Sequence, residues 1–146
     1  MDYTELSEEI CQVHIRYAGI MNRMQSLLLS KGEDSLLIWL DTREDKVTSR
    51  DIADHFQLTT GRVANILKSA ENKGYILRTQ NTEDLRRVYV ELTSEGRDRA
   101  RKIYRQMVKE HSALLELLGE QRALGMIETM EDVFRLVTES EIYAGV

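Results

Sequence analysis

Apolar side chains recur at helical spacing over both ends of this chain. Between residues 4 and 29 they return every three or four positions, which predicts one long amphipathic helix. Lys31 and Gly32 follow, and the glycine is expected to end this helix in a left-handed cap. The same spacing predicts helices over residues 95–118 and 121–139, with a break at residues 119–120. The three apolar stripes exceed what one small domain covers, so we expect them to meet a partner.

Two shorter helices are predicted in the first half of the middle region. One covers residues 35–41 and is followed by a charged turn at residues 44–46. Thr48 then precedes Asp51 by three positions, a variant of the capping box in which Asp replaces the usual Glu or Gln. This pair is expected to begin a helix over residues 49–56.

A further helix follows a tight turn at residues 57–58. Thr59 or Thr60 is expected to cap it, and Gly74 is its stop signal. The small Ala53 lies where the two helices are expected to cross. This is the arrangement of a helix-turn-helix, although an ordinary helical hairpin has the same core spacing. The apolar positions that bury the pair are Ile52, Phe56, Leu58, Val63 and Ile66.

The outward face of this second helix is small or polar, which suits contact with base edges and phosphates in a DNA major groove. Thr59 at the cap, and Ser49 and Arg50 on the preceding helix, are expected to extend the same surface. The outward residues are Thr60, Gly61, Arg62, Ala64, Asn65, Lys68 and Ser69.

Two strands are predicted next, over residues 75–79 and 87–92, from alternating apolar and polar side chains. The polar loop between them carries Asp84 and Arg86 near its end, and Arg87 follows directly. Arginine suits the minor groove of DNA, which concentrates negative potential. A two-stranded wing directly after the helix pair favours a winged helix-turn-helix over a plain hairpin.

Charge and composition refine this picture. Proline, which breaks helix interiors, is absent from the 146 residues. The net charge is −5, but residues 60–105 hold 11 basic and 6 acidic side chains, against 9 and 19 in the rest. A basic middle between acidic ends is expected when one face meets phosphates. A cytoplasmic location is expected, because we find no transmembrane-length apolar run, no signal-peptide pattern and only one cysteine, Cys11.

The segment 48–96 resembles the winged-helix core of the MarR family of bacterial transcriptional regulators. Residues 72–76 (Asn-Lys-Gly-Tyr-Ile) resemble the family's junction into the wing. Asp84 and Arg86, followed by the run of residues 88–96, resemble its wing signature. The resemblance implies that Arg86 enters the minor groove and that Asp84 orients it.

The resemblance also implies a mainly α fold, an α+β winged helix flanked by dimerisation helices. We expect an N-terminal dimerisation helix (residues 1–30), a winged helix-turn-helix domain (35–95, with the helix-turn-helix at 48–74 and the wing at 75–93) and C-terminal dimerisation helices (96–146). The implied function is that of a homodimer that binds a short inverted repeat in double-stranded DNA. A repressor released by a small-molecule effector, with no cofactor and no membrane partner, is the expected mode.

The stretch 29–37 is shorter than in the family and lacks its usual leucine-threonine segment with a following glutamine. Inducers of the family bind near that junction, so the family pattern does not define the shape of a pocket here. For each candidate lining residue, plain core packing is the alternative. The candidates are His14, Tyr17, Met21, Trp39 and Met107.

Cys11 offers an alternative signal, since it lies where peroxide-sensing members of the family keep a reactive cysteine. A buried, inert cysteine is the competing interpretation. His14, His55 and His111 are scattered and have no close ligand pair, so no metal site is expected.

Two other classes of protein were weighed against DNA binding. An enzyme is not expected, because the chain lacks a phosphate-binding glycine loop, a G-x-S-x-G elbow, an H-E-x-x-H motif and paired cysteines. A winged helix used for protein–protein contact usually loses the basic residues of its second helix and wing. This chain keeps Arg62, Lys68, Lys73, Arg78, Arg86 and Arg87.

The surplus apolar stripes lead to a prediction about assembly. We expect the protein to sediment as a dimer at micromolar concentration, because exposed apolar stripes on the terminal helices would otherwise face water. Sedimentation velocity measures this directly, and a clean monomer would refute the dimer.

Overall fold

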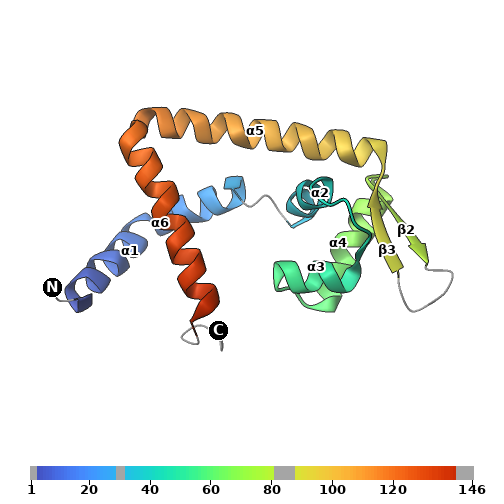
Figure 1. Cartoon of the computed structure of the whole chain (residues 1–146), viewed down its shortest axis with the longest axis horizontal. Coiled ribbons are helices and arrows are strands. Elements are labelled where there is room, and N and C mark those ends of the chain that lie inside the picture. The colour runs from blue at the N-terminus through green and yellow to red at the C-terminus, as the bar shows by residue number, and fades with distance from the viewer. Residues whose placement is uncertain (1–2, 29–31, 81–87, 141–146) are drawn as a thin grey trace. The chain divides into compact units, whose positions relative to one another are not determined.

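The computed structural model describes residues 3–28, 32–80 and 88–140 (Figure 1). The chain divides into two compact units, residues 1–105 and 106–146. Each predicted helix is present, with ends within two residues of those expected from spacing and caps. The fold is the mainly α winged helix that the sequence predicts. The helices are α1 (Tyr3–Leu28), α2 (Glu33–Asp41), α3 (Ser49–Phe56), α4 (Thr60–Asn72), α5 (Ser94–Leu118) and α6 (Glu120–Glu139).

Gly32 does not have the expected left-handed backbone. Its φ of −8° and ψ of −29° lie outside that region, and it stands at the N-cap of α2. The predicted left-handed cap is therefore wrong. A Cβ on Gly32 would lie 2.9 Å from Ile66 Cδ1 on α4, so the glycine permits a close approach between the start of α2 and α4.

The sheet has three antiparallel strands in the order β1-β3-β2: β1 (Val47–Thr48), β2 (Ile76–Gln80) and β3 (Val88–Leu92). The alternating pattern of β2 and β3 predicts the wing hairpin, whereas a two-residue strand is too short to alternate. The sheet therefore has one strand more than the two that the sequence predicts. Val47 pairs with Val90 and Thr48 with Tyr89, so β1 joins the start of α3 to the wing.

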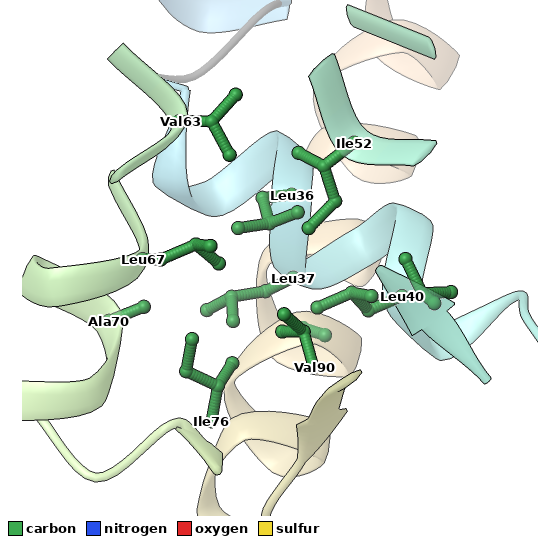
Figure 2. Close-up of a cluster of buried hydrophobic side chains, with 11 residues drawn as sticks. Leu36, Leu37, Leu40, Ile52, Val63, Leu67, Ala70, Ile76 and Val90 are labelled. Carbon is green, nitrogen blue, oxygen red and sulfur yellow. The ribbon is translucent and has the colours of Figure 1, made fainter. Parts of the chain in front are cut away.

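The core of the first unit forms where α2, α3, α4 and the sheet converge (Figure 2). Leu36, Leu37 and Leu40 lie on one side of α2, because positions i, i+1 and i+4 share a helix face. Each such side chain stabilises the fold by roughly 1.5–3 kcal/mol when fully buried. The other buried members are Val47, Ile52, Val63, Leu67, Ala70, Ile76, Val90 and Ala100.

The start of α5 is bound to the turn between α4 and β2. Thr93 Oγ1 donates a hydrogen bond to the Gly74 carbonyl (2.6 Å) and accepts one from the Gly96 amide (3.0 Å). The Thr93 amide donates to the Tyr75 carbonyl at 3.0 Å. Gly74 has a φ of +75°, which fits its predicted role as the stop of α4. Gly96 lies directly against Tyr75, so no side chain fits there.

The second unit contains the rest of α5 and α6. Gly119 (φ +84°) separates the two helices, as the predicted break requires. Ala123 is buried, whereas most large apolar side chains of α6 are exposed. Within residues 3–28, 32–80 and 88–140, no helix is long and apolar enough to cross a membrane. The exposed apolar residues of α6 are Leu124, Met126, Ile127, Met130, Val133, Phe134, Leu136 and Val137.

We expect Gly96→Ala to destabilise the protein by about 3 kcal/mol, because overpacking against rigid backbone forces a shift. The added Cβ would lie 1.9 Å from the Tyr75 carbonyl oxygen. Gly61→Ala is the matched control, since a Cβ there meets nothing within 4 Å. Urea unfolding of both variants measures the difference, and equal midpoints would contradict this account of Gly96.

Candidate nucleic-acid interface

The outward face of α4 is polar and available for contact. Arg62, Asn65 and Lys68 are exposed, and their side chains have no hydrogen-bond or ion-pair partner among the described residues. The small residues beside them, Gly61 and Ala64, are also exposed, so the face between the long side chains is open. An arginine, an amide and a lysine at such spacing supply the donors and the acceptor that base edges and phosphates require.

Both helices of the pair begin at side-chain caps. The Thr48 hydroxyl accepts from the Asp51 amide (3.2 Å), and the Asp51 carboxylate accepts from the Thr48 amide (2.8 Å), which completes the predicted capping box. The sequence leaves Thr59 and Thr60 as alternatives for the second cap. The structure selects Thr59, whose hydroxyl accepts from the Arg62 amide at 3.3 Å.

Hydrogen bonds from the Thr48 side chain and backbone lower the pKa of Asp51 below the usual value for an aspartate. The carboxylate is therefore charged at neutral pH. A negative charge in the first turn also interacts favourably with the positive end of the helix dipole. The turn between the helices is closed by Gln57, which has a left-handed backbone (φ 51°).

Ser69 differs from the other residues predicted to face outward. It is half-buried, and its hydroxyl donates a hydrogen bond of 2.6 Å to Glu33 Oε2 on α2. Lys73 Nζ donates to the same carboxylate at 2.8 and 3.0 Å. Partial burial would raise the pKa of Glu33, but the hydrogen bonds from Lys73 and Ser69 and the nearby positive charges lower it overall. Ser69 thus has an intramolecular partner that the sequence does not reveal.

The two DNA contacts predicted at the start of α3, Ser49 and Arg50, differ in how far they are exposed to solvent. Ser49 is half-buried at the first position of α3. Arg50 is exposed, and its Nε lies 3.8 Å from Asp54 Oδ2, with both side chains mostly in solvent. Such exposed pairs contribute little to stability, so Arg50 remains available to a phosphate.

The tip of the wing lies outside the described residues. The predicted contacts Asp84, Arg86 and Arg87 belong to this part of the chain and stay predictions. The described base of the wing carries Arg78, which forms an ion pair with Glu71 of α4. Hydrogen bonding from Arg78 lowers the pKa of Glu71.

Internal ion pairs occupy much of the basic middle of the chain. Asp41 at the end of α2 accepts from Arg97 (3.5 Å) and Arg101 (3.2 Å) of α5. Asp34 at its start accepts from Arg99 at 3.2 Å. With Lys73 and Arg78 also paired, the local excess of positive charge is a poorer guide to phosphate contact than the sequence indicates. Arg62 and Lys68 remain as cations of α4 without such a partner among the described residues.

A cavity of about 290 Å³ lies between α2 and the start of α5, and it does not use the predicted effector residues. Among those residues, Trp39 stacks on His55 with ring centroids 4.4 Å apart and also contacts Phe56. Of the other predicted lining residues, His14 and Tyr17 are exposed on α1, and Met107 belongs to the second unit. The Met21 side chain lies outside the described part of the chain, so a pocket formed by these residues stays a prediction. The cavity is lined by Ile38, Asp41, Thr42, Ala100, Arg101, Tyr104 and Arg105.

Cys11 and the histidines are the remaining sensor candidates, and the described residues around them do not form a redox or metal site. Cys11 is exposed on α1 in the single chain, so any burial of its thiol would have to come from a partner. Its role in redox sensing stays a prediction. In the described ranges, no three His, Cys, Asp or Glu side chains gather as metal ligands. His55 is exposed on α3.

Comparison with known proteins points to one family. The sequence model of the MarR family matches residues 29–88. The HTH-type transcriptional repressor YetL of Bacillus subtilis (strain 168) is 24% identical over 107 residues, which are 73% of this chain and 64% of that protein. Less than two thirds of that relative's length is therefore covered.

Solved structures show the same fold. The MepR–DNA complex of Staphylococcus aureus has a TM-score of 0.65 at 22% identity, covering 94% of this chain and 99% of that chain. A MarR family protein from Bacillus stearothermophilus has a TM-score of 0.72 at 14% identity, covering 95% and 99%. At these identities the likeness establishes the winged-helix fold.

The capping box leads to a prediction with a defined pH dependence. We expect Thr48→Ala to destabilise the protein by about 1 kcal/mol at neutral pH, because it removes a helix cap. Since the pKa of Asp51 is lowered in the folded protein, the contribution of this pair is complete above pH 3.8 and is lost as the pH falls further. Urea midpoints of wild type and variant, measured from pH 7 downwards, should therefore approach each other only below pH 3.8, and the gap that remains reflects the lost bond from the Asp51 amide to the Thr48 hydroxyl.

Thr60→Ala is the matched control for this series. Thr60 is exposed at the first position of α4, where Thr59 is already the cap. A gap between wild type and Thr48→Ala that widens on acidification would be inconsistent with the capping box.

Proposed function

We propose that this chain is a member of the MarR family, whose sequence model matches residues 29–88, and that it is a homodimeric DNA-binding transcription regulator. The observation that carries the proposal is the outward face of α4. Arg62, Asn65 and Lys68 lie exposed on a helix that is held from behind by the buried Val63, Leu67 and Ala70. A rigid helix with a polar face of this kind matches the recognition helix that enters a major groove.

The fold supplies the rest of a DNA-reading surface. The MepR relative is solved in complex with DNA, which supports the same use of the winged helix here. We place α4 in the major groove, Arg50 on a flanking phosphate, and the predicted wing residues Asp84, Arg86 and Arg87 at the neighbouring minor groove. Ser69 is assigned to the support of α4, because its hydroxyl is bonded to Glu33.

Exposed apolar helices support the homodimer. On α1, Ile10, Val13 and Ile15 are 58%, 49% and 76% exposed, and on α6 Phe134 is 62% exposed. A soluble regulator covers such surfaces with a partner, and two-fold pairing is the commonest solution. A two-fold dimer would present its recognition helices roughly 34 Å apart and read an inverted repeat.

Repression relieved by a small molecule is the mode that we propose. The B. subtilis relative is named a repressor, which supports the sign of regulation. The cavity between α2 and α5 is the candidate effector site, since it combines apolar walls at Ile38 and Tyr104 with the cation Arg105. A pocket of this mixed lining is typical of small-molecule sites.

Binding measurements test the proposed function. A duplex selected by the wild-type protein from random DNA should bind at least about 10³-fold more tightly than unrelated DNA. We expect Arg62→Ala and Asn65→Ala to weaken the selected duplex by about tenfold or more, because each loses base-edge contacts, while binding to unrelated DNA changes little.

Lys102→Ala is the control for Arg62→Ala in these experiments. Lys102 is an exposed cation on α5 without a partner in the described chain, so its removal subtracts the same charge away from α4. Equal losses in Arg62→Ala and Lys102→Ala would mean that net charge, and not the face of α4, determines binding. No selected duplex at all would refute DNA-specific regulation.

A further inference from the structure

The first turn of α2 meets α4 at a single carboxylate. The Glu33 side chain is only 15% exposed, and it accepts hydrogen bonds from Ser69 Oγ (2.6 Å) and Lys73 Nζ (2.8 and 3.0 Å). All three groups belong to the first unit. Hydrogen bonds to an ionised carboxylate are stronger than neutral ones, especially where water is partly excluded.

A second contact lies next to the first. Gly32, directly before Glu33, approaches Ile66 of α4 so closely that a Cβ would lie 2.9 Å from its Cδ1. Ile66, Ser69 and Lys73 follow one another at intervals of three and four residues, so they form one stripe along α4. The start of α2 therefore contacts α4 along most of the helix's second half.

This stripe adjoins the outward face of α4. At about 100° per residue, Lys68 and Asn65 lie on the side of the stripe that faces away from the buried Leu67 and Ala70. Rotation of α4 about its axis would move the outward side chains and break the Glu33 contacts together. Binding side chains need to be held within about 10–20° of the productive geometry, so such rotation is costly for sequence reading.

We infer that Glu33 is a positioning residue for DNA recognition: its carboxylate holds α4 at Ser69 and Lys73 and so sets the orientation of the face that reads bases. The inference rests on the proposed DNA-binding function. Lys73 is half exposed, and solvent weakens its ionic attraction, so the part-buried bond from Ser69 is the more rigid of the two. The lowered pKa of Glu33 agrees with a net favourable environment for its charge.

Electrostatics and positioning make opposite predictions for the loss of this carboxylate. Glu33→Ala removes a negative charge and frees Lys73, so charge alone would tighten binding to every DNA. Loss of positioning instead weakens the selected duplex and spares unrelated DNA. The ratio of the two affinities, which a merely stabilising residue would not change, is therefore the informative measurement.

The test uses the full-length protein, a duplex selected by wild type from random DNA, and an unrelated duplex of equal length. We expect the affinity of Glu33→Ala for the selected duplex to fall about tenfold, while its affinity for the unrelated duplex stays level or rises. Glu44→Ala is the matched control, since Glu44 is an exposed carboxylate after α2 without a partner in the described chain. It should keep the wild-type preference.

Ser69→Ala provides a second variant that leaves the net charge unchanged. We expect it to lower the preference for the selected duplex about threefold, because it removes only one of the bonds to Glu33. If circular dichroism at the assay temperature shows that Glu33→Ala does not fold, the binding of Ser69→Ala alone tests the positioning role of Glu33.

Each outcome has a distinct meaning. Glu33→Ala and Ser69→Ala proteins that retain the wild-type preference, or that change both affinities equally, overturn the role of Glu33 and leave the proposed function intact. A wild-type protein that prefers no duplex overturns the proposed function and the role of Glu33 with it.

Discussion

The burial of one face of α2 is the interaction on which the winged helix depends. Leu36, Leu37 and Leu40 are 1%, 0% and 6% exposed, and α2 packs through this region on α4 and β3. Three buried leucines supply roughly 5–9 kcal/mol of hydrophobic stabilisation, which is comparable to the net stability of a small domain. The same core also holds α4, which packs on α2, α3 and β2 through the buried Val63, Leu67 and Ala70.

The charges of α2 follow from the same packing. With its apolar side covered, the acidic groups at its two ends lie beside the helices that cover it. Glu33 and Asp34 at the start and Asp41 at the end therefore pair with α4 and α5. These pairs place four basic side chains of the middle region in the scaffold, namely Lys73, Arg97, Arg99 and Arg101. Among the described residues of α4, the cations without such a partner are Arg62 and Lys68, so the charge available to the proposed DNA-binding face is smaller than the sequence count indicates.

Local caps and tertiary contacts together set the orientation of α4. Thr59 fixes its first turn, and the capping box of Thr48 and Asp51 fixes the first turn of α3. Thr48 also belongs to β1, which pairs with β3, so the same residue joins the helix pair to the wing. A displacement of α3 would therefore also disturb the pairing of β1 with β3.

By itself, the sequence determined the order and ends of the helices, the wing hairpin and the outward face at Arg62, Asn65 and Lys68, because spacing, caps and stop residues act over a few positions. Only the tertiary structure decided that Gly32 serves a close approach to Ile66. It also decided that β1 completes the sheet and that Ser69 faces Glu33. These contacts join residues that lie far apart in the sequence, such as Glu33 and Ser69, which are 36 positions apart, and no local pattern encodes a partner at that distance. The packing of α2 brings its start beside α4, and the sheet brings β1 beside β3.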